Sequence, residues 1–300
     1  SSLNKVTLSK NLEEIKGWAF QNTPITSITI PEGLKTISRG GFQNCGNLTD
    51  VSLPNGLTEI YEEAFKDCQG LKQIVIPDSV KEIHSSAFEN CCFLERISLP
   101  QTITEIADRM FYGCASLKKV VIPDTVTKIG DNAFCLCVAL NDINMPSVLN
   151  SLGDSAFAGC QKLSALTLPD SVEEVGSFAL SATDLSNINF PKNLNRVGEN
   201  IFSETPYAKN IENTDGNGGL YWQNWLVSYD NNAATVIIKA GTEHIADAVF
   251  AESYTGGTLS VPDGIKTIGE RAFLSSDFTE VTIPDSVTKI GRFAFDQCLS

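Results

Sequence analysis

The sequence has few of the residues on which most enzyme and metal sites depend. It contains only two histidines, His84 and His244, in different parts of the chain and with no partner at ligand or triad spacing. General acid–base and nucleophilic catalysis need several such groups that converge. We therefore expect no catalytic residues, no metal, no cofactor and a protein that is not an enzyme.

Basic charge and long apolar runs are also scarce. Lys and Arg number 22 against 36 Asp and Glu, which gives a formal net charge of −14. An acidic surface repels phosphate backbones and anionic lipids, and no stretch reaches the roughly 18 apolar residues of a membrane span. We therefore expect neither nucleic acid nor membrane contact by this chain.

What the sequence does contain is an internal repeat of 22 or 23 residues. Every copy has an anchor, which is Phe in all copies but one, and an aliphatic residue lies five positions before each anchor. The anchors are Phe20, Phe42, Phe65, Phe88, Phe111, Phe134, Phe157, Leu180, Phe202, Phe250, Phe273 and Phe295. A fixed period of this length is typical of a solenoid in which stacked copies bury a shared core.

Between anchors the sequence favours short extended segments. Residues 117–123 (LKKVVIP) alternate apolar and polar positions and end in proline. Such a pattern predicts a half-buried strand, which stops where proline removes the N–H that a ladder needs. A second extended piece, such as 125–129 (TVTKI), leads into a tight helical turn before the anchor. The sequence predicts one repeat-solenoid domain over 1–300, with parallel β-strands and about twelve repeats.

The repeat resembles that of BspA-like leucine-rich repeat proteins of bacterial cell surfaces. Segments 117–137 (LKKVVIPDTVTKIGDNAFCLC) and 278–298 (FTEVTIPDSVTKIGRFAFDQC) match its hallmark positions, and the likeness covers nearly the whole chain. The resemblance implies a leucine-rich-repeat solenoid, an extracellular or bacterial-surface location and adhesion to host proteins or other cells. Because the chain ends inside a repeat, we expect a piece of a longer protein, with targeting signals outside it.

Most of the cysteines follow the repeat. Seven of nine lie three residues after an anchor, a position that Thr or Ser takes in the other copies. This position suits a small side chain that bonds to the backbone of a tight turn. Equivalent side chains in stacked copies point the same way, which is poor disulfide geometry. We expect reduced thiols and no zinc site.

One break interrupts the period, where an aromatic-rich segment at about 206–232 is inserted. Residues 220–222 and 225–229 are expected to form a hairpin around Gln223 and Asn224. Two interpretations remain open: the aromatics fill the interrupted core, or they bind a ligand such as a carbohydrate. The candidate ligand contacts are Tyr221, Trp222, Trp225 and Tyr229.

A second candidate surface is the outward column of the first strand in each repeat. This column varies between copies, as a contact surface or a merely solvated face would. Its candidate ligand contacts are Asp50, Gln73, Arg96, Lys119 and Asp142. The leading hypothesis is a cell-surface adhesion or protein-binding module whose partners are extracellular proteins of a host or neighbouring cell. The alternatives are a carbohydrate-binding module that uses the insertion and a passive spacer within a larger surface protein.

Overall fold

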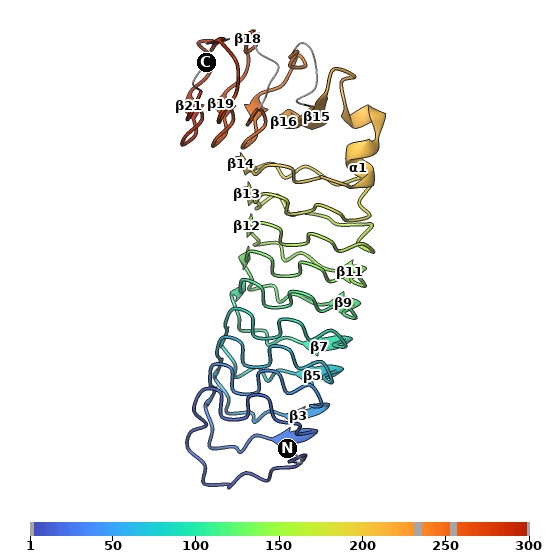
Figure 1. Ribbon diagram of the computed structural model, residues 1–300, viewed down its shortest axis with the longest axis vertical. Helices are drawn as coiled ribbons and strands as arrows, with labels where there is room; N and C mark the ends of the chain where they lie inside the picture. Colours follow the sequence, from blue (N-terminus) through green and yellow to red (C-terminus); the bar gives the residue numbers. More distant parts are fainter. Residues whose placement is uncertain (1–2, 231–235, 253–256, 299–300) are drawn as a thin grey trace.

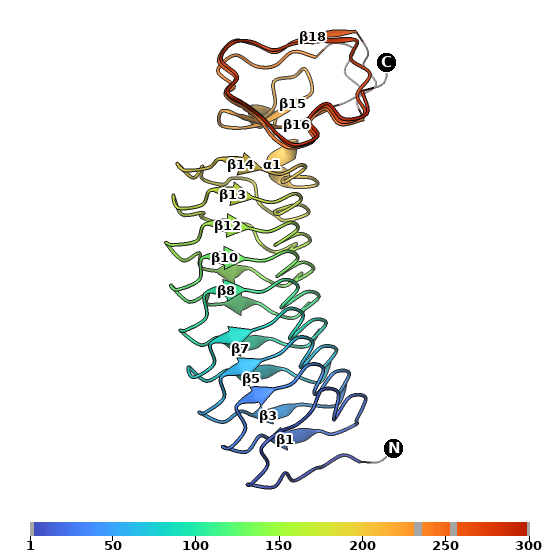
Figure 2. The same cartoon turned by 90° about the vertical axis from the view of Figure 1, so that its left-hand side faces the viewer.

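The computed structural model describes residues 3–230, 236–252 and 257–298, which form a solenoid of stacked turns (Figures 1 and 2). Almost every regular element is a strand of two or three residues, and the strands of successive turns pair in parallel. The predicted leucine-rich-repeat fold class is therefore confirmed. Equivalent residues one repeat apart face each other, as Gln73 faces Arg96 and Lys119 faces Asp142.

Each turn offers two places for a short strand. The first strand precedes the closing proline and is formed by β1 (Ser27–Thr29), β3 (Asp50–Ser52), β5 (Gln73–Val75), β7 (Arg96–Ser98), β9 (Lys119–Val120), β11 (Asp142–Ile143), β18 (Thr258–Ser260) and β20 (Glu280–Thr282). The second strand ends at the aliphatic residue five before the anchor and is formed by β2 (Thr36–Ile37), β4 (Glu59–Ile60), β6 (Glu82–Ile83), β8 (Glu105–Ile106), β10 (Lys128–Ile129), β12 (Ser151–Leu152), β13 (Glu174–Val175), β14 (Arg196–Val197), β17 (His244–Ile245), β19 (Thr267–Ile268) and β21 (Lys289–Ile290). The solenoid therefore presents two different strand faces.

The anchors form the centre of the core. From Phe20 to Phe157, neighbouring rings are stacked with centroids 5.2–5.8 Å apart. Leu180 interrupts the aromatic stack, which resumes from Phe250 to Phe295. One repeat cannot cover both faces of its own ring, so burial of each anchor depends on both neighbours.

The return to each anchor is made of consecutive turns and not of regular helix. Residues two before and two after the anchor are left-handed, as Asn132 (φ 56°) and Leu136 (φ 61°) are around Phe134. These residues direct the backbone N–H groups towards the next turn. Phe134 donates to the carbonyl of Ala156 at 2.8 Å, and Leu136 donates to that of Ala158 at 2.8 Å. The turns are thus held together by backbone hydrogen bonds as well as by the core.

The seven cysteines that lie three residues after an anchor hydrogen-bond to the backbone, as their position predicts. The thiol of Cys137 donates to the carbonyl of Phe111, the anchor of the preceding repeat, at 3.1 Å, and Cys114 bonds Phe88 in the same way. Burial raises the pKa of the Cys114 and Cys137 thiols well above the ordinary value, which keeps them protonated as donors. All nine cysteines lie in the described ranges, and all are free.

Candidate binding surfaces

The insertion begins with a short helix, α1 (Pro206–Lys209), and a single 3₁₀ turn over Ile211–Asn213. The expected hairpin follows, with β15 (Gly219–Trp222) antiparallel to β16 (Trp225–Tyr229). Trp222 and Trp225 form the last cross-strand pair before the turn, where Gln223 is left-handed (φ 55°). Positions 231 and 232 of the predicted insertion lie outside the described residues.

All four aromatic candidates for ligand contact are buried. Tyr221, Trp222, Trp225 and Tyr229 are between 1% and 6% exposed. Side chains buried to this degree present almost no area to a sugar. Their placement goes against ligand contact and agrees with the interpretation that they fill the interrupted core.

The hairpin covers the ends of both stacks of turns. The Trp222 ring meets Phe190 and Phe202 edge-on, with centroids 5.4 Å away in each case. On the other side, Tyr229 packs on Phe250 at 5.2 Å. The apolar end that each stack would otherwise expose to water is thereby buried.

The tyrosine hydroxyls of the hairpin hold the surrounding loops. Tyr221 donates to the Asp215 carboxylate and accepts from the backbone N–H of Lys239, both at 2.9 Å. Tyr229 donates to the carbonyl of Asn217 at 2.7 Å. These polar groups are satisfied within the protein, so the hydroxyls have a structural role.

The direction of stacking changes at the insertion. β16 pairs with β17 and places Leu226 beside the core residue Ile245, but β14 pairs with neither strand. In Figure 1 the turns up to β14 stack along the vertical, whereas β16, β19 and β21 lie side by side across the picture. The solenoid therefore has an elbow between β14 and β16.

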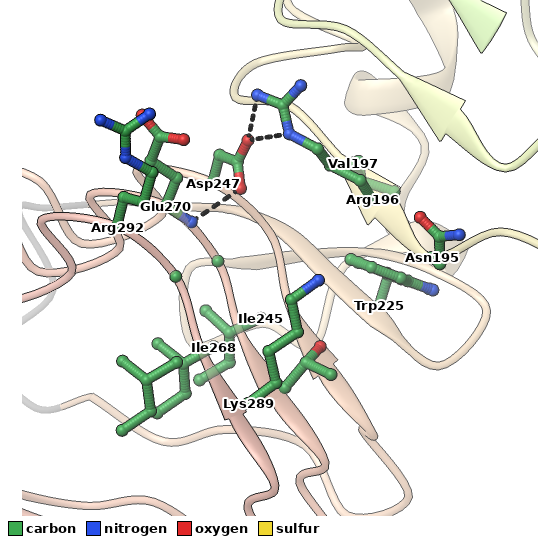
Figure 3. A pocket seen from close by; sticks show the side chains of 14 residues that line it. Asn195, Arg196, Val197, Trp225, Ile245, Asp247, Ile268, Glu270, Lys289 and Arg292 are labelled. Atoms are coloured by element: carbon green, nitrogen blue, oxygen red, sulfur yellow. Dashed lines mark hydrogen bonds and ion pairs between the residues drawn. The ribbon is translucent and has the colours of Figure 1, made fainter.

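A groove of about 280 Å³ lies at this elbow. Arg196 of β14 crosses it to Asp247, with Nη2 and Oδ2 at 2.9 Å, and Trp225 also lines the groove (Figure 3). The Trp225 ring stacks on His244, with centroids 4.4 Å apart. Burial raises the pKa of Asp247, although Arg196 opposes this rise. Sequence reasoning missed this groove because no repeat pattern predicts which residues meet across an elbow.

The first-strand candidates lie on the surface as expected. Asp50, Gln73, Arg96, Lys119 and Asp142 are exposed and occupy equivalent positions in successive turns. Lys119 pairs with Asp142 at 2.6 Å, and Arg96 donates to Gln73 at 3.2 Å. We call these five residues and their neighbours Val75 and Val121 the strand face. The two valines are 70% and 56% exposed, which makes this face partly apolar.

The second-strand face contains a cluster that sequence reasoning also missed. Nε2 of His84 lies 2.7 Å from Oε1 of Glu59 and 3.7 Å from Oε2 of Glu82. The expectation that His84 has no partner at ligand spacing is therefore wrong. Parallel pairing of β4 with β6 brings Glu59 beside Glu82 and close to His84, although Glu59 belongs to the preceding repeat. The signal available in the sequence was the outward position of the second strand, which holds Glu in successive repeats.

Comparison with known proteins agrees with this architecture. The family model for the BspA type leucine rich repeat region matches residues 1–94, 81–209 and 224–300. The chain belongs to this family. No protein with a curated description matches the chain.

Two solved structures resemble this BspA-type chain over most of its length. A leucine-rich repeat protein from Bacteroides ovatus is 24% identical, with a TM-score of 0.59 that covers 95% of this chain and 80% of that one. A leucine rich cell surface protein from Faecalibacterium prausnitzii is 24% identical, with a TM-score of 0.53 over 98% and 84% of the two chains. Both likenesses support the solenoid fold. Among the described residues of the BspA-type chain, no helix is long and apolar enough to cross a membrane.

Proposed function

We propose that the chain is a non-enzymatic protein-binding module of a bacterial cell surface, and that its strand face adheres to extracellular proteins of a host or neighbouring cell. The observation that carries this proposal is the combination of exposed valines and exposed charged residues on one set of strands. Protein interfaces combine apolar contact area with a polar, solvent-accessible rim. The strand face has exposed valines among charged residues, and the four aromatics of the insertion do not add to it because they are buried.

The strand face is also ordered in the unbound protein. Within the strand face, β5 pairs in register with β7, and β9 pairs in register with β11, at the strand spacing of about 4.8 Å that is usual in sheets. The contacts of Lys119 with Asp142 and of Arg96 with Gln73 restrict the side chains further. A surface ordered in this way loses little conformational entropy on binding. The description of the Faecalibacterium relative as a cell surface protein supports the proposed location.

Charge reversal on the strand face is expected to weaken adhesion. In Arg96→Glu with Lys119→Glu, the positive charges are lost and a new Glu faces Asp142, so the affinity for a bound protein should fall at least about tenfold. The measurement is biolayer interferometry of the purified chain against a panel of extracellular-matrix proteins. A glycan array provides the parallel test of the carbohydrate alternative.

The matched control is Lys81→Glu with Lys128→Glu, which makes the same change in net charge at exposed positions outside the strand face. The control should keep the affinity of the unmodified chain. Equal loss in both double variants would contradict a specific role for the strand face. Absence of binding to every protein and glycan would contradict the proposal and favour the passive spacer.

A further inference from the structure

The Glu59, Glu82 and His84 cluster has the composition of a metal site. One oxygen from each glutamate and one imidazole nitrogen all lie within 4.8 Å of one another. Zinc bonds carboxylate oxygens and imidazole nitrogens at about 2.0–2.2 Å, so three such ligands around one ion lie roughly 3.5 Å apart. Small side-chain rotations would bring the three atoms to that spacing, because Glu82 is exposed and Glu59 and His84 are only partly buried. We propose that these residues bind a zinc ion, with the fourth coordination position open to solvent.

The ligand types favour zinc over the harder divalent cations. Calcium takes six to eight oxygen ligands, and magnesium keeps an octahedral shell of oxygens. Imidazole suits zinc and similar transition metals, and a site with one His and two Glu leaves the open position found at many zinc centres. Two glutamate charges also balance the charge of the divalent ion.

The backbone brings two like charges together at this place. Glu59 and Glu82 are direct partners in the β4 and β6 pair, because Ile60 and Ile83 beside them are held in register by the core. Like charges directly opposite on neighbouring strands destabilise a sheet. Glu105 occupies the equivalent position in the following turn and adds to the negative charge. A bound cation would relieve this repulsion.

Tyr61 packs against the proposed His84 ligand. Its ring is stacked on the His84 imidazole, with centroids 5.1 Å apart and planes 7° from parallel. A ring that packs on a ligand in this way restricts the rotamers of that ligand, which helps to pre-organise a metal site. Glycine or alanine follows the second strand in most other repeats, so this repeat has a ligand where those have none.

The test is isothermal titration of zinc chloride into the metal-free chain. All proteins carry Cys92→Ser, Cys135→Ser and Cys298→Ser, because these three thiols are only half-buried and cysteine is itself a common zinc ligand. The expected result is one zinc ion per chain, bound at least about tenfold more weakly in His84→Ala, Glu59→Gln or Glu82→Gln. Zinc should also raise the melting temperature of the parent chain and leave that of His84→Ala unchanged.

His244→Ala is the matched control, because His244 is the other histidine and lies beside a single glutamate, Glu243. The control should bind zinc as the parent does. Circular dichroism of each variant establishes that it is folded. The proposal is overturned if zinc does not bind, if its affinity is the same in His84→Ala, or if His244→Ala loses as much.

Discussion

Replacing Phe134 with alanine is expected to destabilise the chain by about 3–5 kcal/mol. The ring is fully buried and lies between Phe111 at 5.3 Å and Phe157 at 5.2 Å. Backbone hydrogen bonds hold the turns on both sides at a fixed spacing, so the cavity cannot collapse. The measurement is urea unfolding followed by far-UV circular dichroism, in which the midpoint should move to lower urea concentration.

Two control variants separate loss of the stack from loss of any aromatic ring. Phe93→Ala removes a ring that is 57% exposed and should change stability by less than about 1 kcal/mol. Phe134→Leu should cost less than Phe134→Ala, because Leu180 occupies the anchor position of its own repeat. If Phe134→Ala and Phe93→Ala unfold at the same urea concentration, the stacked core does not stabilise the solenoid.

Replacing Trp222 with alanine is expected to cost a similar amount, about 3–5 kcal/mol. The ring is 1% exposed and packs edge-on against Phe190 and Phe202, where it closes the end of the first stack. Its loss should expose that end and loosen the elbow first. Hydrogen–deuterium exchange should therefore increase around residues 185–205 before the chain unfolds as a whole.

The control for Trp222 is Trp18→Ala, which removes a tryptophan that is 47% exposed and far from the elbow. It should leave both stability and exchange near the elbow almost unchanged. A Trp222→Ala variant that keeps full stability and loses a glycan signal would contradict the structural role of the hairpin. That outcome would favour the carbohydrate alternative.

The repeat period made much of the fold predictable. An invariant spacing between aliphatic residue and anchor sets the register of one repeat on the next. The stacking neighbours of Phe134 and the exposed position of Lys119 can therefore both be predicted from the repeat period. The thiol of Cys137 bonds the backbone because its position accepts Cys, Ser or Thr alike. The left-handed residues around each anchor had a signal as well, since Asn often occupies those positions and tolerates that conformation.

Contacts that depend on the break in the period were not predictable in the same way. The ion pair between Arg196 and Asp247 exists because the stacking direction turns at the hairpin, and no local pattern encodes that turn. Composition alone left the role of Trp222 and Trp225 open, because buried and ligand-binding aromatics look identical in a sequence. The His84 cluster was hard to predict for a different reason: Glu59 belongs to the preceding repeat and comes close to His84 only through the pairing of β4 with β6.

The most direct test of the strand face as the adhesive surface is hydrogen–deuterium exchange with and without the matrix protein that binds the chain best. The predicted result is protection of β5, β7 and β9, with unchanged exchange in β15 and β16 and in the second strands. Protection confined to the hairpin, the elbow or the second-strand face would contradict the account.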